Sequence, residues 1–532
     1  MFTGKGPSMT AFTFAGSRRP GSARSRLAVS ATALATALAA TLVAGQAARA
    51  EVTAQQVWDD WNDSLAMYGE GAVTIGSEES GDGAVTVTDI AFTMTGEDGT
   101  VITGTLPSLV LTENGDGTVD VAMSEDYPIT ISSPGDASTG QEPTDVALAI
   151  RQSGMTMTVS GDPGAMTYDL AAARYALELD AVTEGGVEMP AEAMLAFNDV
   201  SGSYTTTTAD MRTIEYDLGA ASLDLLVDAT NPDDGSTVSL SGKVADLATQ
   251  ASMAMPLDAV ADPEMMMMNG LALDGGYSYG GADYIFEVAD ATGPTSGTLS
   301  TGAGELAFSV SSDSVTYDSS VTGVAVEVAS AMMPFPISAT VAEYGISLLV
   351  PMSATDAPTD WAFGLNLTDL AVNEEIWAML DPGAMLPHDP ATAIIDLTGT
   401  ATLFYDFMDP AQMEAMEAAA VPGEINSVSL NDLNLSIGGA QVTGTGAFTL
   451  DNTDMTTFAG IPRPEGAVDL QVDGLNGLID TLVSMGLLPQ EQVMGARMML
   501  GLLFVPAGDD QLTSRIEVTA DGQLLANGQR LQ

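Results

Sequence analysis

The chain has 532 residues, of which 72 are acidic and only 14 are basic, so its formal net charge is −58. Such a charge repels nucleic-acid phosphates and anionic lipid headgroups at long range, and this excludes a nucleic-acid-binding protein. Cysteine is absent, so disulfides are excluded and the fold must depend on its apolar core.

The N-terminus has the three parts of a secretory signal peptide. Four arginines between positions 18 and 26 precede an apolar stretch from Leu27 to Gly45, and a small-x-small site ends at Ala50. We therefore expect residues 1–50 to be removed. Six of the 14 basic residues and none of the acidic ones lie in this segment, so the remaining chain has eight basic against 72 acidic residues, a net charge of −64.

One helix is predicted directly after the signal. In "VTAQQVWDDWNDSLAMYG" the apolar residues recur at helical spacing, and Gly69 is the expected stop. The predicted apolar face consists of Val57, Trp58, Trp61, Leu65 and Tyr68.

Beyond this helix the hydrophobic period falls to two residues, which is typical of an antiparallel sheet with one dry and one wet face. "GAVTVTDIAFTM" alternates through Val85 and Val87 and then through Ile90, Phe92 and Met94. "VLTENGDGTVDVAM" is typical of a hairpin with the tip Asn-Gly-Asp-Gly. The pattern recurs in "YALELDAV", "STVSLSGKVADL" and "ISATVAEYGISLLV".

Two short helices are predicted in the second half of the chain. "NEEIWAMLDP" is the first, and "FMDPAQMEAMEAAAVPG" contains the second, with a start near Asp409-Pro410. Strands resume in "NSVSLNDLNLSIGGAQVTGTGAFTLD". Its glycines allow a tight bend or a close approach to the backbone. They are Gly438, Gly439, Gly444 and Gly446.

A helical hairpin is predicted near the C-terminus. Gly486 ends the first helix and Pro489 begins the second. The first helix has one apolar stripe, formed by Leu475, Leu478, Ile479, Leu482 and Val483. The second has a stripe facing it, formed by Val493, Ala496, Leu500, Leu503 and Phe504, and a further apolar side formed by Met494, Met498, Leu502 and Val505.

We expect this second helix to lie wedged between its partner and the sheet, because it is too short to span a bilayer and contains Arg497. There it would close one end of an apolar groove as a plug. The predicted plug residues are Met494, Met498, Leu500, Leu502, Leu503 and Phe504. "DDQLTSRIEVTADGQLLANGQRLQ" then returns to the sheet as a terminal hairpin. Of the arginines after Pro462, we expect at least some to pair with carboxylates; they are Arg463, Arg497, Arg515 and Arg530.

Together these elements predict a mainly β protein with a few helices. We expect a long curved antiparallel sheet, either an open groove or a flattened half-barrel, in one lobe or two, with the N-terminal helix and the C-terminal helical hairpin packed on it. The expected regions are the signal peptide (1–50), the N-terminal helix with a β-rich region (51–370), and a β-rich region with helical insertions and the hairpin (371–532), continuous with the preceding sheet.

Little in the chain supports catalysis. Nucleophilic catalysis needs a base, and the single histidine, His388, lies alone in a proline-flanked loop. No His or Cys cluster exists for zinc or iron. Carboxylate pairs for glycoside hydrolysis lack aromatic platforms, since the chain has four tryptophans. We therefore expect no enzyme and no cofactor.

Two metals remain as alternatives to structural explanations. "ENGDGTVD" and "NPDDGST" offer closely spaced oxygens for calcium, but both are also turns. The 30 methionines offer thioethers for Cu(I), or an adaptable apolar lining. We favour turns and apolar packing, with loose divalent screening of the acidic surface.

Several segments together resemble an exported alphaproteobacterial family, domain of unknown function 2125. They are "VWDDWNDSLAMYG", "IWAMLDPGAMLPHDPATAIIDLTGTA", "GAQVTGTGAFTLDN" and the run from "IPRPEGAVDLQVDGLNGLIDTLVSMGLLPQ" to the C-terminus, and they are densest after Ile376. The ending "IEVTADGQLLANGQRL" is similar to the closing strands of AsmA-like envelope proteins. His388 stands where the family pattern has arginine. The resemblance implies a curved sheet whose apolar concave face carries lipid, and it implies no reaction.

Two functions from different classes stay open. The first is a non-catalytic exported protein in the periplasm of a Gram-negative bacterium that binds an apolar ligand such as a lipid, or another envelope component, on the concave face of its sheet. The second is a structural or interaction protein whose core is filled by its own side chains. Neither involves nucleic acid or a membrane span after signal cleavage, and the sequence leaves the oligomeric state open.

Overall fold

The computed structural model describes residues 51–66, 71–96, 98–135, 142–257, 265–419 and 421–531. The predicted signal peptide, together with Tyr68 and Gly69 at the predicted end of the first helix, lies outside these ranges. The description below concerns these residues alone.

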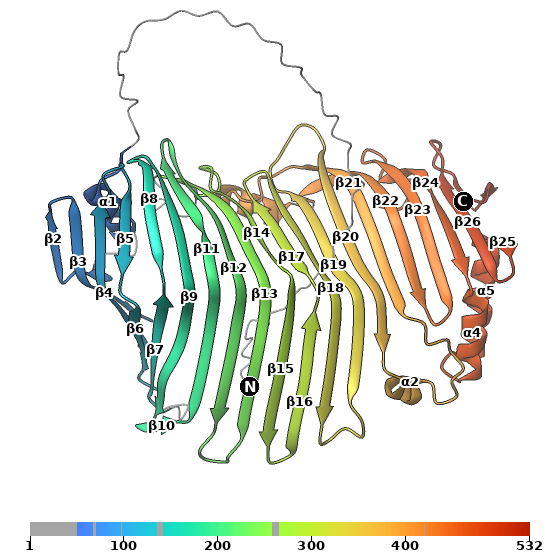
Figure 1. The fold of residues 1–532 in the computed structure, drawn as a ribbon. Coiled ribbons are helices and arrows are strands. Elements are labelled where there is room, and N and C mark those ends of the chain that lie inside the picture. The colour runs from blue at the N-terminus through green and yellow to red at the C-terminus, as the bar shows by residue number, and fades with distance from the viewer. Residues whose placement is uncertain are drawn as a thin grey trace, which may run out of the picture.

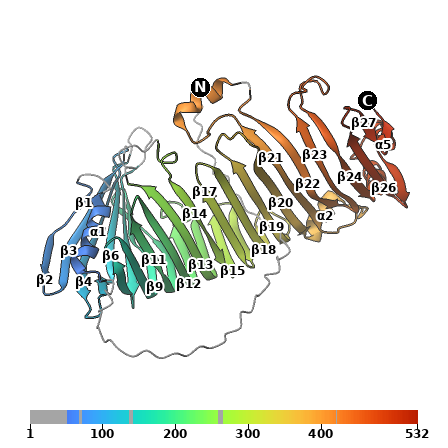
Figure 2. The same cartoon turned by 90° about the horizontal axis from the view of Figure 1, so that it is seen from above.

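The described chain forms one sheet of 28 strands in which every ladder is antiparallel. Most neighbouring positions in the sheet follow the order of the chain, so the topology is largely a meander (Figure 1). No pairing joins the first described strands to the last, and the two views place these ends far apart (Figures 1 and 2). The prediction of a long antiparallel sheet is thereby confirmed, as an open sheet.

The strands range in length from two to 20 residues. At the N-terminal end they are β1 (Val73–Thr74), β2 (Ser77–Gly81), β3 (Ala84–Thr95), β4 (Val101–Glu113), β5 (Val119–Met123), β6 (Asp126–Ser133), β7 (Thr144–Ser153), β8 (Thr156–Asp162) and β9 (Ala165–Glu184). In the middle they are β10 (Val187–Met189), β11 (Ala191–Thr208), β12 (Met211–Thr230), β13 (Thr237–Pro256), β14 (Ala272–Tyr279), β15 (Gly281–Asp290), β16 (Gly293–Thr301), β17 (Gly304–Val310), β18 (Ser314–Ser330), β19 (Ile337–Pro351) and β20 (Thr359–Val372). At the C-terminal end they are β21 (Ala391–Leu403), β22 (Gly423–Ile437), β23 (Ala440–Asp451), β24 (Arg463–Asp473), β25 (Val505–Gly508), β26 (Gln511–Val518), β27 (Leu524–Ala526) and β28 (Gln529–Arg530).

Some positions in the sheet are filled by two strands placed end to end. β14 and β15 both pair with β13, β16 pairs with β15, and β17 pairs with β14. The ladder between β20 and β21 spans the predicted boundary near residue 370 and pairs Leu370 with Ala391. The sheet is therefore continuous across that point.

The helices occupy three places along the sheet. α1 (Ala54–Ala66) lies at the N-terminal end, as predicted. α2 (Glu374–Leu380) and α3 (Met413–Ala418) interrupt the later strands, and α3 follows a 3-10 turn at Pro410–Gln412 in which Asp409 accepts a hydrogen bond from the Ala411 N–H. α4 (Leu475–Ser484) and α5 (Gln490–Leu503) lie beside the C-terminal strands (Figure 1). Gly438 and Gly439, both at positive φ, form the tight turn between β22 and β23.

A line of left-handed residues crosses the sheet. Asp89, Asp199, Asp246 and Asp369 have φ of 50 to 55°, and Gly323 has φ of 58°. The ladder between β11 and β12 is interrupted at Asp199 and Val200 and then resumes in the same register. Ala221 of β12 lies opposite Asp199 of β11 on one side and opposite Asp246 of β13 on the other. The interruptions in neighbouring strands therefore lie side by side, and we call this line the crease.

The crease changes which residues of a strand face the core. In a regular strand, residues three apart point to opposite faces. Val87 and Ile90 lie on either side of Asp89, and both pack in the same core cluster. The left-handed residue thus lets the apolar side chains before and after it reach the same face of the sheet.

The sheet is curved around α1. This helix packs on Val85 and Val87 of β3, and its Asp60 also lies 3.4 Å from Arg212 of β12. Several strands separate β3 from β12, at about 4.8 Å each, whereas a helix is only about 10 Å wide. A single helix contacts both because the sheet wraps around it, so the face that carries α1 is concave at this end.

Candidate functional site

The concave face carries an unbroken apolar row along nearly the whole sheet. Register shows that its members lie directly opposite one another, strand after strand, so they share one face. The row starts in the core under α1 at Val119 and ends at the C-terminal edge, and only aromatic, aliphatic and glycine residues form it. The row is Val119, Val159, Tyr168, Tyr204, Tyr216, Ala251, Gly275, Phe308, Tyr317, Leu348, Phe363, Leu397, Leu430, Gly446, Val468, Ile516 and Ala526.

A second apolar row runs on the other side of the crease. Its first members, Tyr127 and Ile150, line a cavity together with Leu65 of α1, so this row is on the same face as the helix. The row is Tyr127, Ile150, Leu177, Leu195, Leu225, Gly242, Tyr284, Leu299, Val326, Ala339 and Val372. The concave face is therefore apolar on both sides of the crease.

The opposite face is polar. Successive residues of a strand point to opposite faces, so the residue that follows or precedes a member of an apolar row points to the other face of the sheet. The row beside the first one contains Thr205, Glu215, Ser252, Asp274 and Ser309, which pair in that order. Beside the second row, Asp224, Lys243, Asp283 and Ser300 pair across neighbouring strands. The sheet thus separates an acidic, hydroxyl-rich face from an apolar one.

Much of the apolar face is only partly covered. Tyr277 is 51% exposed, Val350 is 41% exposed, and Leu299 and Val326 are 36% exposed, although all four lie on the concave face. Other large side chains of this face are half-buried against their neighbours in the curved sheet. No second layer covers the middle strands among the described residues. This open apolar surface is the candidate binding site.

At the N-terminal end the face is covered by α1. Val57 and Trp58 of the helix are buried against Leu109, Tyr168 and their neighbours. Beside them lies a cavity of about 580 Å³ between the helix and four strands. Its lining is Trp58, Asp60, Trp61, Ser64, Leu65, Ile90, Leu106, Leu109, Tyr204, Thr206, Arg212 and Ile214.

A second cavity of about 310 Å³ adjoins the first. The two share Leu65, Ile90 and Leu106 in their linings. The second cavity extends from these residues to Tyr127, Ile150 and Tyr175, and Tyr175 is 37% exposed at the margin of the open face. The space under α1 is thus continuous with the apolar face.

Trp61 and Tyr204, which line the first cavity, belong to a group of aromatic rings with the buried Tyr168. Tyr168 and Tyr204 stack with ring centroids 4.2 Å apart, and Trp61 lies 6.1 Å from Tyr168. Burial, reinforced by the charge of Asp60, raises the pKa of Tyr168 to about 12. Burial also raises the pKa of Tyr204. Both phenols are neutral at physiological pH, so Tyr204 offers the cavity an uncharged ring.

The predicted position of α5 was wrong. The helix was expected to lie between α4 and the sheet, but Met494, Met498 and Leu502 are 71%, 73% and 59% exposed. Val493 alone is buried, while Leu500, Leu503 and Phe504 are half-buried. The physical reason is position: α4 and α5 lie beside the last strands, where no further layer covers their outer side (Figures 1 and 2). The cavities described above are at the other end, under α1.

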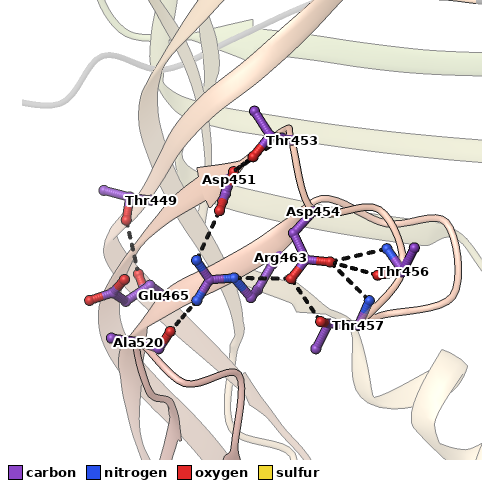
Figure 3. A network of polar contacts seen from close by, with 9 residues as sticks. All are labelled: Thr449, Asp451, Thr453, Asp454, Thr456, Thr457, Arg463, Glu465 and Ala520. Carbon is purple, nitrogen blue, oxygen red and sulfur yellow. Dashed lines mark hydrogen bonds and ion pairs between the residues drawn. The ribbon is translucent and has the colours of Figure 1, made fainter.

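Arg463 fastens the loop before β24 (Figure 3). Its Nη2 lies 2.9 Å from Asp451 and its Nε lies 3.3 Å from Asp454, while Nη1 donates to the Ala520 carbonyl. Asp454 also accepts hydrogen bonds from the N–H groups of Thr456 and Thr457. The Thr457 hydroxyl, at 2.7 Å, is the main reason that the pKa of Asp454 is lowered to about 2.

The other C-terminal arginines lie apart from one another. Arg497 lies 2.5 Å from Asp480 and joins α5 to α4, and Arg515 lies 2.6 Å from Asp469 of the neighbouring strand. Arg530 lies in β28 opposite Leu525. Arg497 and Arg515 thus each join two neighbouring elements, at separate places in the fold.

His388 belongs to a local cluster next to α2. Its ring stacks on Trp377 with centroids 4.4 Å apart, and its Nδ1 lies 3.0 Å from Glu374. Asp381, which is buried, accepts hydrogen bonds from the N–H groups of Met385 and Leu386 and fixes the intervening loop. The histidine therefore docks its loop on α2.

The segments weighed for calcium are turns. Asp116 accepts hydrogen bonds from Thr118 at the tip of the hairpin between β4 and β5, and Asp234 accepts one from the Ser236 N–H. Over the described ranges, no group of three or more His, Cys, Asp or Glu side chains is placed to hold a metal ion.

Sequence reasoning missed the polar residues of the cavity. Arg212 and Asp60 come from β12 and α1 and lie 152 positions apart in the chain, so spacing alone does not connect them. The available signal was the small number of basic residues: Arg212 is one of eight after residue 50, and it lies at the start of β12.

Part of the chain is similar to a known protein family. In the part that the structure describes, no helix has both the length and the apolar character needed to cross a bilayer. No curated protein and no solved structure matches the chain. A family model does match, from within β15 to just before β28, as the segments quoted after Ile376 predict. Residues 283–528 are similar to the family described as "uncharacterized protein conserved in bacteria (DUF2125)".

Proposed function

We propose that the protein is an exported, non-catalytic binding protein of the periplasm that holds the acyl chain of a lipid on the concave face of its sheet. The observation that supports this most directly is the apolar row from Val119 to Ala526, which continues through the open middle strands. Its Tyr216, in the middle of the sheet, is 38% exposed. An apolar surface of this extent on a single-layer sheet lowers its free energy when it is covered by a ligand.

The shape of the surface favours a chain-like ligand. The two rows run along the sheet on either side of the crease, and each continues from strand to strand, so each row is a long apolar track. A flexible acyl chain can follow such a surface, and each methylene removed from water contributes about 0.8 kcal/mol. At Gly242, a glycine of the second row, the ring of Tyr284 lies over the backbone and continues the apolar surface.

The charge distribution supports the same ligand class. After residue 50 the chain has a net charge of −64, and its polar face carries carboxylates such as Asp224 and Asp274. Such a face is repelled by an anionic membrane surface. The apolar face, in contrast, carries few charges along its rows. The arrangement favours binding of individual lipid molecules through their tails.

Two variants of neighbouring residues test the role of the face. Leu299 and Ile285 lie in paired strands, but Leu299 lies opposite Tyr284 on the concave face, and Ile285 lies opposite Thr298 on the polar face. Leu299→Asp is expected to reduce the binding of an apolar fluorescent dye and the amount of co-purifying lipid. Ile285→Asp adds the same charge on the other face and is expected to leave both unchanged.

The measurement is mass spectrometry of lipids extracted from the purified protein, together with dye titration and the melting temperature of each variant. Acyl lipids at a fixed ratio to wild-type protein support the proposal. An empty extract, with no dye binding to wild-type protein, contradicts it and favours a structural protein whose core is filled by its own side chains. Equal binding by the two variants places the ligand elsewhere than on the concave face.

A further inference from the structure

One of the few cations of the chain lines an apolar cavity. Arg212, at the start of β12, is 15% exposed and faces the space of about 580 Å³ under α1. Most of that space is lined by Trp58, Trp61, Leu109 and similar side chains. The chain has only eight basic residues after residue 50 against 72 acidic ones. A guanidinium in such surroundings loses hydration and requires compensation.

The contacts of Arg212 within the protein use only part of its capacity. A guanidinium has five N–H donors. Its Nη2 donates to the Ser64 hydroxyl at 3.0 Å and lies 3.4 Å from Asp60. The contact with Asp60 is longer than a strong charge-assisted hydrogen bond, which is about 2.7 to 2.9 Å. The buried Nε has no partner among the described residues.

Arg151 is a guanidinium of the same chain that has close carboxylate partners. On the polar face, its Nη1 lies 2.8 Å from Glu178 and its Nη2 lies 2.8 Å from Asp180. Arg151 thus contacts two carboxylates at short distance although its surroundings are more exposed. Arg212, which is more deeply buried, has the weaker partners. The difference indicates that Arg212 has donors to offer to a molecule in the cavity.

We propose that the cavity under α1 binds the anionic head of a single-chain amphiphile, a carboxylate or a phosphate ester, with Arg212 as the residue that contacts the head. Ser64 and Asp60 position the guanidinium from α1. The tail runs past Leu65, Ile90 and Leu106 into the second cavity and toward Tyr175 at the open face. This inference rests on the proposed function and names the ligand class for one end of the same surface.

The test compares ligands that share a chain and differ in the head. Decanoate, decyl phosphate and decanol are titrated against the purified protein by calorimetry at fixed ionic strength. Both anions are expected to bind about tenfold more tightly than decanol, because a charge-assisted hydrogen bond is stronger than a neutral one. Whichever anion binds more tightly identifies the carboxylate or the phosphate ester as the preferred head.

Three variants separate head recognition from a purely structural role. Arg212→Met is expected to reduce both anions to the affinity of decanol while decanol binding is retained. Asp60→Asn removes the carboxylate beside the guanidinium and is expected to strengthen anion binding alone. Lys243→Met removes one positive charge from the polar face, where Lys243 is exposed beside Asp224, and is expected to change none of the ratios.

The outcomes distinguish this inference from the proposed function. If all three ligands bind wild-type protein equally, or if Arg212→Met preserves the preference for anions, the head site is wrong and binding on the apolar face stands. If none of the three binds, the proposed function itself is contradicted. A variant that loses anions and decanol together, with a lowered melting temperature, assigns Arg212 to the folding of α1 and also overturns the head site.

Discussion

Aspartates in this chain are stabilised largely by nearby hydroxyl and amide groups. Asp98, Asp290 and Asp451 each accept hydrogen bonds from the backbone N–H and the hydroxyl of a threonine two positions later. These bonds lower the pKa of all three carboxyls. With so few cations available, such hydrogen bonds help to keep carboxylates charged, and at Asp451 they add to the ion pair with Arg463.

Asp454 is the clearest case for a pH measurement. Its folded-state pKa is about 2, below the ordinary value of 3.8, so its ionisation contributes stability that is complete above about pH 4 and is lost as the pH falls through 2. We expect Thr457→Val to raise this pKa toward 3.8, because the Thr457 hydroxyl is the main cause of the shift. The measurement is carboxyl-detected NMR titration of Asp454.

The control for this change is Thr449→Val. The Thr449 hydroxyl donates to the backbone carbonyl of Glu465 and has no carboxylate partner (Figure 3). It is expected to leave the titration of Asp454 unchanged. An unaltered titration in Thr457→Val as well would show that the backbone amides of Thr456 and Thr457 suffice to hold the carboxylate charged.

At the scale of single elements, the sequence predicted the helices better than their surroundings. The period of α1 identified Val57, Trp58, Trp61 and Leu65 as one face, and all four pack on the core. The period of α5 was equally clear, yet Met498 is 73% exposed. Helical spacing shows which side chains share a face, but not whether the fold supplies a surface to cover that face. The sheet wraps around α1, whereas α5 lies beside the last strands.

Substitution of Trp58 tests how much the contact between α1 and the curved sheet contributes to the free energy of unfolding. The side chain is 1% exposed, and Trp58→Ala is expected to reduce the free energy of unfolding by about 3 to 5 kcal/mol, because a large cavity replaces the indole. Asp59→Ala, at the neighbouring exposed position, is expected to change it by no more than about 0.5 kcal/mol. Urea denaturation followed by tryptophan fluorescence and circular dichroism tests both values. Similar effects for the two variants would show that α1 is not required to hold the curved end together.

The crease is the element that single-strand reasoning could not find. Five short segments each resemble a strand whose alternation of apolar and polar residues is interrupted once, where an aspartate or glycine separates two apolar residues. They are "VTDIA", "FNDVS", "VADLA", "VTGVA" and "LTDLA". Their left-handed residues line up across the sheet only through the register of strands that are far apart in sequence. Register depends on partners outside the segment, so each motif indicates a break but not a shared line.

At the scale of the whole molecule, the alternation of single strands was enough to predict one apolar and one polar face. The direction of curvature could not be predicted, because it depends on contacts such as that of Asp60 with Arg212, which join distant segments.

The net charge also has a consequence for the whole molecule. The net charge of −64 after residue 50 resides mainly on one layer of strands, so neighbouring carboxylates on the polar face repel one another across the whole sheet.

This repulsion predicts that salt stabilises the protein. The screening length falls from about 30 Å at 0.01 M to about 3 Å at 1 M ionic strength, so the melting temperature is expected to rise continuously over this range. Calcium and magnesium chlorides are expected to act equally at equal ionic strength, because the oxygen-rich turns at Asp116 and Asp234 already use their carboxylates within the protein. Differential scanning calorimetry in sodium, magnesium and calcium chloride measures the effect. Saturation at micromolar calcium, without a matching effect of magnesium, would contradict general screening and require a dedicated calcium site.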